Sequence, residues 1–124
     1  MAGVMTLVLL LLAGPAAAHR GGCGLGLGLE ALRGAEGALR VGAEAPSLLA
    51  GREAAGQAAD RLAEAAGRLA GCGCARAAGE AQEAAGLAEG LRGAAELERI
   101  RRGLDRARFS ARLARERLDR QGCS

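Results

Sequence analysis

A very small set of residue types builds this chain, and that restricts what it can fold into. Residues 19–124 contain two β-branched residues, Val41 and Ile100, and a single aromatic residue, Phe109. Strands are enriched in β-branched and aromatic side chains, whereas the alanine, leucine, arginine and glutamate that dominate here favour helices. We therefore expect an all-α protein.

The amino-terminal segment has the features of a secretory signal peptide. Residues 1–18 carry no charged side chain, contain an apolar run interrupted only by Thr6, and end in three alanines after Pro15. Signal peptidase accepts such small residues, and the run is too short to span about 30 Å of hydrocarbon. We expect cleavage after Ala18, a periplasmic or secreted protein with no remaining transmembrane segment, and one helical domain over residues 19–124. The alternative is an uncleaved anchor.

Four cysteines, Cys23, Cys72, Cys74 and Cys123, form an even set with a regular spacing. Cys72 follows Cys23 by 49 residues, and Cys123 follows Cys74 by 49 residues. In an exported chain such a set predicts two disulfides and no free thiol, with three possible connectivities. A ring closed between Cys72 and Cys74 would be strained, which favours pairing of these two with Cys23 and Cys123.

Apolar periodicity predicts four helical segments, at about 25–44, 47–70, 75–92 and 95–121. The last has the strongest signal, because its apolar residues recur at steps of four and three. These residues are Ile100, Leu104, Ala107, Ala111, Ala114 and Leu118. The apolar phase changes near Pro46, which suits the first position of a helix, and again near Gly90 and Gly93.

Two architectures fit this pattern, and both are held together by the two disulfides. One is a small up-down-up-down bundle of four helices with all cysteines at one end. The other is a long helical hairpin that turns at Cys72-Gly73-Cys74. The phase changes favour the bundle, whereas the lack of a clear loop at residues 90–93 favours the hairpin. Four helical glycines are expected to allow close helix approach: Gly34, Gly37, Gly67 and Gly86.

The sequence offers little material for catalysis or for a cofactor. Beyond residue 18, hydroxyls occur only at Ser47, Ser110 and Ser124, and the single imidazole is His19 at the expected mature terminus. A catalytic pair needs rigidly held partners, so we expect no catalytic residue, cofactor or metal. A metal or redox role for the cysteines at 72 and 74 is kept as an alternative, because thiolates bind soft metals.

Charge is distributed unevenly along the chain. Residues 19–98 hold 8 arginines and 11 acidic residues, whereas residues 99–124 hold 9 arginines and 3 acidic residues. A basic last helix can contact anionic lipid, lipopolysaccharide or an acidic protein. Alternatively it docks on the acidic first three helices, or its charges pair within the helix. The pairs expected there are Glu98/Arg102, Arg101/Asp105, Arg112/Glu116 and Arg115/Asp119.

Phe109 falls about 180° from the apolar seam of this last helix. It shares that face with Arg102, Arg106, Leu113 and Arg120. An aromatic side chain among arginines suits insertion into an anionic surface, so Arg102, Arg106, Phe109 and Arg120 form a candidate binding site. The alternative is that Phe109 belongs to a core that covers the helix on two sides.

The absence of several residue types also indicates where in the cell the protein is located. Lysine, asparagine and tyrosine are absent, which suggests GC-rich bacterial coding DNA and hence a periplasmic location. A chance reading frame would show the same bias, but the cysteine spacing and the heptads argue against it.

Our first hypothesis is an exported, non-catalytic protein with a structural or protein-interaction role. The alternatives are a binder of anionic envelope surfaces through the last helix and a cysteine-based metal or redox protein. Nucleic acid is not an expected partner.

Overall fold

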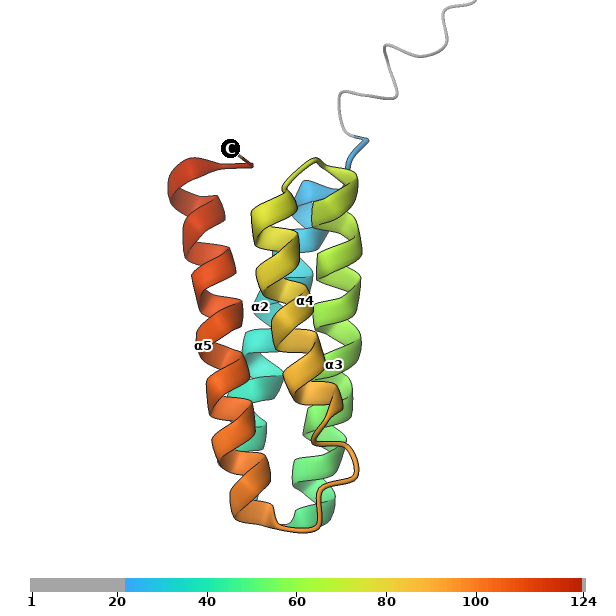
Figure 1. Ribbon diagram of the computed structural model, residues 1–124, viewed down its shortest axis with the longest axis vertical. Coiled ribbons are helices and arrows are strands. Elements are labelled where there is room, and N and C mark those ends of the chain that lie inside the picture. Colours follow the sequence, from blue (N-terminus) through green and yellow to red (C-terminus); the bar gives the residue numbers. More distant parts are fainter. Residues whose placement is uncertain (1–21, 124) are drawn as a thin grey trace, which may run out of the picture.

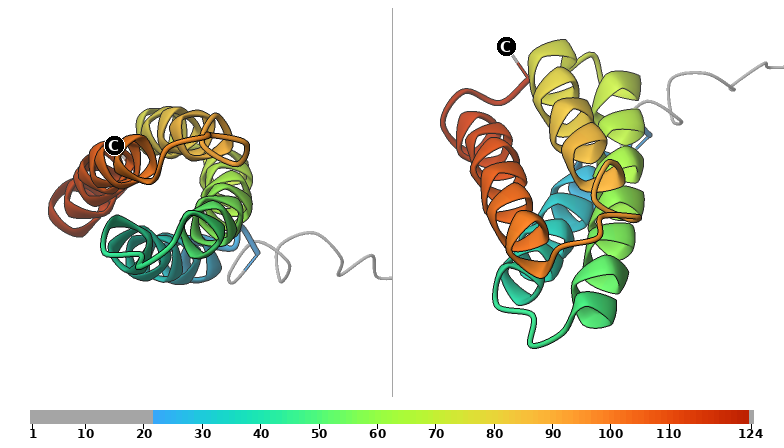
Figure 2. Two further views of the ribbon diagram at one scale, coloured as in Figure 1. Left: turned by 90° about the horizontal axis from the view of Figure 1, so that it is seen from below. Right: turned by 60° about the horizontal axis from the view of Figure 1, so that its bottom comes forward.

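The fold is an all-α bundle, in a computed structural model that describes residues 22–123 (Figure 1). Its helices are α2 (Leu25–Ala43), α3 (Leu48–Gly71), α4 (Ala75–Glu89) and α5 (Leu97–Gln121). Consecutive helices run antiparallel, and α5 packs against both α4 and α2, so the four helices form a ring (Figure 2). The four-helix bundle is therefore confirmed, and the long hairpin is not the observed architecture.

The chain turns between α2 and α3 at residues 44–47, where the phase change predicted it. The backbone of Ser47 is extended. Its Oγ accepts a hydrogen bond of 3.1 Å from the Ala50 amide, which caps the first turn of α3. A side-chain cap of this kind satisfies one of the amides that a helix start leaves unpaired. The expectation that Pro46 opens the helix is wrong, because Pro46 precedes this cap.

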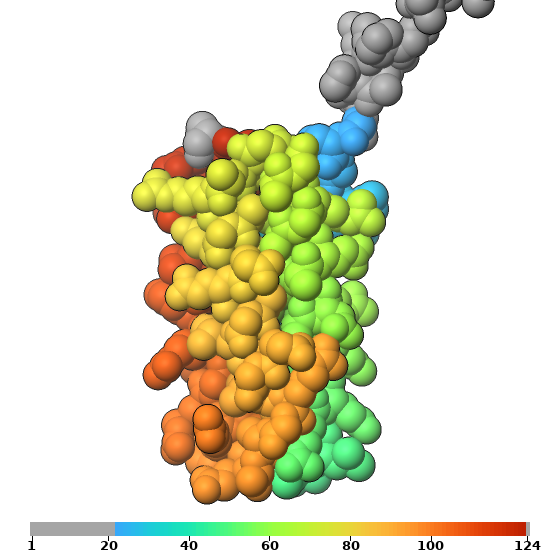
Figure 3. Space-filling model, turned by 45° about the vertical axis from the view of Figure 1, so that its right-hand side comes forward, coloured from blue at the N-terminus to red at the C-terminus, as the bar shows by residue number. Residues whose placement is uncertain are grey.

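The connection from α4 to α5 is a series of turns over residues 90–96, so α4 ends three residues earlier than predicted. Arg52 of α3 donates from Nε to the Ala94 carbonyl at 2.9 Å. Arg92 donates to the Gly56 carbonyl at 3.2 Å and to the Asp60 carboxylate at 2.6 Å. These bonds anchor the connection on α3, against which it packs in Figure 3.

The core fills the space between the four helices and consists largely of alanine. All six seam residues predicted for α5 are buried, and Leu32, Leu39, Leu62 and Leu69 of α2 and α3 are fully buried. No buried polar or charged side chain occurs in the described part of the chain. The predicted heptad seam is confirmed.

The expected role of the helical glycines is largely wrong. A Cβ at Gly37, Gly67 or Gly86 would meet nothing within 4 Å, and one at Gly34 would meet only the flexible side chain of Arg61. Close approach occurs at other glycines, such as Gly42, which faces Leu104 and Ala54. The positions of these glycines in the sequence did not show which side of α2, α3 or α4 faces a neighbouring helix.

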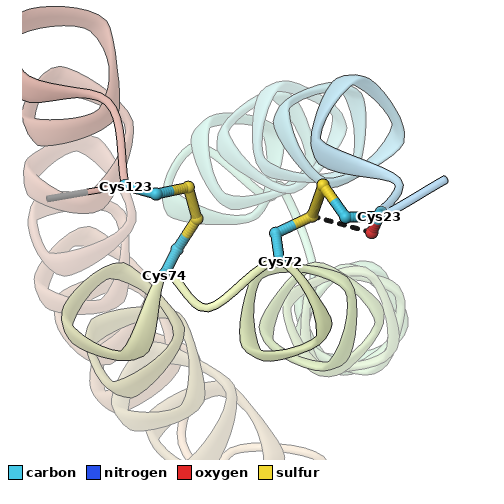
Figure 4. The surroundings of a disulfide bond; sticks show 4 residues. All are labelled: Cys23, Cys72, Cys74 and Cys123. Carbon is cyan, nitrogen blue, oxygen red and sulfur yellow. Dashed lines mark hydrogen bonds between the residues drawn. A yellow bond between two sulfur atoms is a disulfide. The ribbon is translucent and has the colours of Figure 1, made fainter. Parts of the chain in front are cut away.

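Both disulfides lie at one end of the bundle (Figure 4). Cys23 is bonded to Cys72 and Cys74 to Cys123, with Cα–Cα distances of 4.8 and 4.4 Å. Between them Gly73 has a φ of +77°, a conformation that glycine adopts without steric cost. The turn sends Cys72 toward the start of α2 and Cys74 toward the end of α5. The described residues contain no free cysteine, so the expected pairing is confirmed.

Candidate functional site

Three arginines of α5 bind groups outside their own helix. Arg115 pairs with Glu36 of α2 and Arg117 with Glu80 of α4, each with a shortest N–O distance of 2.6 Å. Arg101 donates from Nε and Nη2 to the Ala45 carbonyl at 3.1 and 2.6 Å. The hydrogen bond to Glu36 raises the pKa of Arg115 above its ordinary value. Docking of α5 on the acidic helices is thus confirmed for Arg115 and Arg117.

Only two of the four predicted pairs within α5 form. Arg112 pairs with Glu116 at 3.8 Å and Arg115 with Asp119 at 3.1 Å. The predicted pairs Glu98/Arg102 and Arg101/Asp105 are wrong. Glu98 pairs instead with Arg101 at 3.7 Å, and Arg101 donates to Ala45 in the turn between α2 and α3. Within the described residues this leaves Arg102 without an ion pair.

The predicted binding residues Arg102, Arg106, Phe109 and Arg120 are all exposed. Phe109 is 54% exposed, so the alternative that it belongs to the core is wrong. The guanidinium carbon of Arg112 lies 5.9 Å from the centre of its ring, within the range of a cation–π contact. Leu113, also on this face, is 36% exposed. We call Arg102, Arg106, Phe109 and Leu113 the outer α5 face.

An open groove of about 400 Å³ lies between the end of α4 and the start of α5. Its lining from α4 and the following turn is Gly86, Leu87, Gly90 and Leu91, and its lining from α5 is Arg99, Arg102, Gly103 and Arg106. We call it the α4–α5 groove. None of its arginines is in an ion pair among the described residues, and no acidic residue lines it. It is therefore positively charged, with an apolar floor.

The groove brings Arg102 and Arg106 together but leaves Arg120 out. Arg120 lies 14 residues beyond Arg106 in the sequence, which corresponds to about 21 Å along the axis of α5. Arg99 was missed by sequence reasoning. Its position three residues before Arg102 and seven before Arg106 places it on the same side of the helix and could have identified it.

The arrangement is suited to binding. All four cysteines are in disulfides, so none is left as a thiolate ligand or nucleophile in this structure. Among residues 22–123 no cluster of three histidine, cysteine or acidic side chains is placed to hold a metal ion. None of the four described helices combines the length and apolarity needed to cross a membrane. The signal-peptide segment and His19 lie outside the described residues.

Comparison with known proteins gave no match to a family model, a curated protein or a solved structure. The fold and the site themselves define the class of protein. It is a small four-helix bundle with two disulfides at one end and a basic, partly apolar surface along its last helix.

Proposed function

We propose that this is an exported, non-catalytic protein with a structural or interaction role, which attaches to an anionic surface of the cell envelope through the outer α5 face. The observation that carries the proposal is the exposure of Phe109 on the side of α5 that also carries Arg102 and Arg106, which are in no ion pair among the described residues. In helices that lie on membranes, aromatic and leucine side chains insert between lipids while arginines contact anionic headgroups.

Export is supported by the cysteines and by the sequence of residues 1–18. Disulfides form and persist in oxidising compartments, and both bridges of this protein close at one end of the bundle. A periplasmic or extracellular location would also bring the outer α5 face within reach of anionic lipids and lipopolysaccharide.

Vesicle sedimentation tests the proposal. The oxidised protein should sediment with vesicles that contain phosphatidylglycerol and not with vesicles of phosphatidylcholine alone. Binding should weaken as salt rises, because salt screens exposed charges. Phe109→Ala should reduce binding, whereas Val41→Ala, which removes a 64% exposed side chain from α2, should not. Equal binding to both vesicles, or equal effects of both substitutions, would overturn the proposal.

An acidic protein surface is the second candidate partner, and the opposite side of α5 favours it. Arg33 and Arg40 of α2 and Arg108 of α5 line a second hollow, of about 210 Å³, and none of these arginines is in an ion pair among the described residues. Glu36 also lines this hollow, but it is paired with Arg115. The α5 region is therefore basic on two sides. Polyglutamate serves as the probe: the double substitution Arg40→Gln and Arg108→Gln should weaken its binding more than vesicle binding if the partner is a protein.

A further inference from the structure

We propose that the α4–α5 groove binds the headgroup of one phosphorylated lipid, with the first carbons of its apolar chain against the leucines of the groove. The inference rests on the proposed function and deepens it, because it names the chemical group that the basic surface recognises. It concerns a defined site for one molecule, whereas the outer α5 face provides a general contact with the surface.

The charge of the groove favours a phosphate. Arg99, Arg102 and Arg106 project from one side of α5 into the same hollow. Guanidinium groups present their N–H donors in a planar fork that matches phosphate oxygens in pairs. The neighbouring acidic residues Glu89 and Glu98 are already paired with Arg92 and Arg101, so the three charges of the groove are available.

The floor of the groove favours a ligand that also has an apolar part. Leu87 is partly exposed there, and Leu91 closes the base. Gly86 and Gly90 contribute no side chain, and a Cβ at Gly86 would meet nothing within 4 Å. A volume of about 400 Å³ is at the small end of ligand sites, which run from about 300 to 1,000 Å³. It can hold a headgroup and a few carbons.

Contacts made by the turn after α4 fix the walls of the groove. A Cβ at Gly103 would lie 2.5 Å from Leu91 Cδ1, so α5 meets the turn after α4 closely at this point. Arg92, the next residue, is bonded to Glu89, Gly56 and Asp60. Walls held in this way are formed before a ligand arrives, which lowers the entropic cost of binding.

The groove also lies where a membrane-bound lipid could enter it. Phe109 follows Arg106 by three residues and Arg102 by seven, so it lies on the same side of α5 within two turns. A surface into which Phe109 inserts would therefore present its headgroups to the groove.

The test is isothermal titration of the oxidised protein with dihexanoyl phosphatidic acid below its micellar concentration. We expect saturable binding of one molecule. Inorganic phosphate, which lacks the chain, and dihexanoyl phosphatidylcholine, which is zwitterionic, should each bind at least tenfold more weakly.

Matched variants assign the binding to the groove. Gly86→Leu should fill it and weaken binding at least tenfold, and Gly86→Ala should have a smaller effect in the same direction. Gly79→Leu is the control, since Gly79 is exposed on the same helix two turns earlier and outside the groove. Arg99→Gln, which removes an arginine that lines the groove but is not part of the outer α5 face, should also weaken binding, while Arg120→Gln should leave it unchanged.

The outcomes separate this inference from the proposed function. Absence of saturable binding, equal affinity for inorganic phosphate, or equal losses in Gly86→Leu and Gly79→Leu would overturn the lipid site. Tighter binding of a glutamate-rich peptide than of the lipid would overturn it as well. Vesicle binding that depends on Phe109 without short-chain lipid binding would reject the groove alone. Short-chain lipid binding without vesicle binding would support the groove and reject attachment to a surface.

Discussion

Arg115 and Glu36 form a two-point ion pair that joins α5 to α2. Arg115 Nε lies 2.6 Å from Glu36 Oε2, and Arg115 Nη2 lies 3.2 Å from Glu36 Oε1. The two side chains are 26% and 18% exposed, so solvent screens the pair only in part. Because α2 and α5 are far apart in sequence, this contact closes the ring of helices.

Arg115→Gln should therefore lower the free energy of unfolding by about 1–2 kcal/mol, since it leaves Glu36 without its charged partner. Arg112→Gln is the control. Arg112 pairs only within α5, at 3.8 Å, and about half of its side chain is exposed, so its loss should cost about 0–0.5 kcal/mol. Urea denaturation of both variants measures the difference. Equal losses would contradict a special role for the pair with Glu36.

The disulfide connectivity can be tested by non-reducing mass spectrometry. Trypsin cuts after Arg68 and Arg76, so Cys72 and Cys74 share one peptide. That peptide should be found linked to the peptides of both Cys23 and Cys123. Direct linkage of Cys23 to Cys123, with a closed Cys72–Cys74 ring, would contradict the structure.

Each disulfide should contribute similarly to stability, because both close loops of the same sequence separation, 49 residues. Removing either one, through Cys23→Ala with Cys72→Ala or Cys74→Ala with Cys123→Ala, should cost about 2–4 kcal/mol. The free energy of unfolding of the two double variants, measured with urea, is the readout. A much larger loss from one bridge would show that something other than loop closure determines its contribution.

Phe109→Ala should hardly change the melting temperature, since the side chain is 54% exposed. Leu104→Ala provides the contrast. Leu104 is fully buried on the same helix, and its truncation should cost about 2–5 kcal/mol. Thermal melts followed by circular dichroism compare the two. A loss in Phe109→Ala as large as that in Leu104→Ala would place Phe109 in the core and remove the basis of the surface proposal.

Glycine-to-alanine substitutions at two helical positions should change the free energy of unfolding in opposite directions. At Gly42 the new Cβ would lie 2.9 Å from Ala54 Cβ and would also meet Leu104, so Gly42→Ala should destabilise the bundle. At Gly67 it would meet nothing within 4 Å, so Gly67→Ala should stabilise α3 by up to about 1 kcal/mol. Urea denaturation gives the sign at each position, and a gain at Gly42 would contradict the close approach of α2 to α5.

Periodicity and cysteine spacing predicted much of the fold. The seam from Ile100 to Leu118 is buried as expected. A single apolar row on a helix leaves water only when that side of the helix packs against its neighbours. The turn at Pro46 and the cysteine pairing also follow from local chemistry. The end of α4 was placed three residues late, because the alanine and leucine pattern continues past it. There the amides of Leu91 and Arg92 donate to the carbonyls of Ala88 and Glu89, three residues back, as in a turn.

The candidate site was predicted in part. Phe109 and its neighbouring arginines were assigned to the outer side of α5 by their angle from the seam, and their exposure agrees. The groove could not be predicted, because its floor comes from Leu87 and Leu91 and its space from Gly86. These residues meet Arg99 only after the chain has reversed at residues 90–96.

The sequence alone determined the helical class, the seam of α5 and the expectation of two disulfides, since these depend on residue type and on spacing along the chain. Tertiary structure decided which charges remain available. Nine arginines between residues 99 and 124 look alike in sequence, but Arg115 is held by Glu36 of α2 while Arg102 has no ion-pair partner among the described residues. That difference depends on which side of α5 faces another helix, and only the packing of the four helices fixes it.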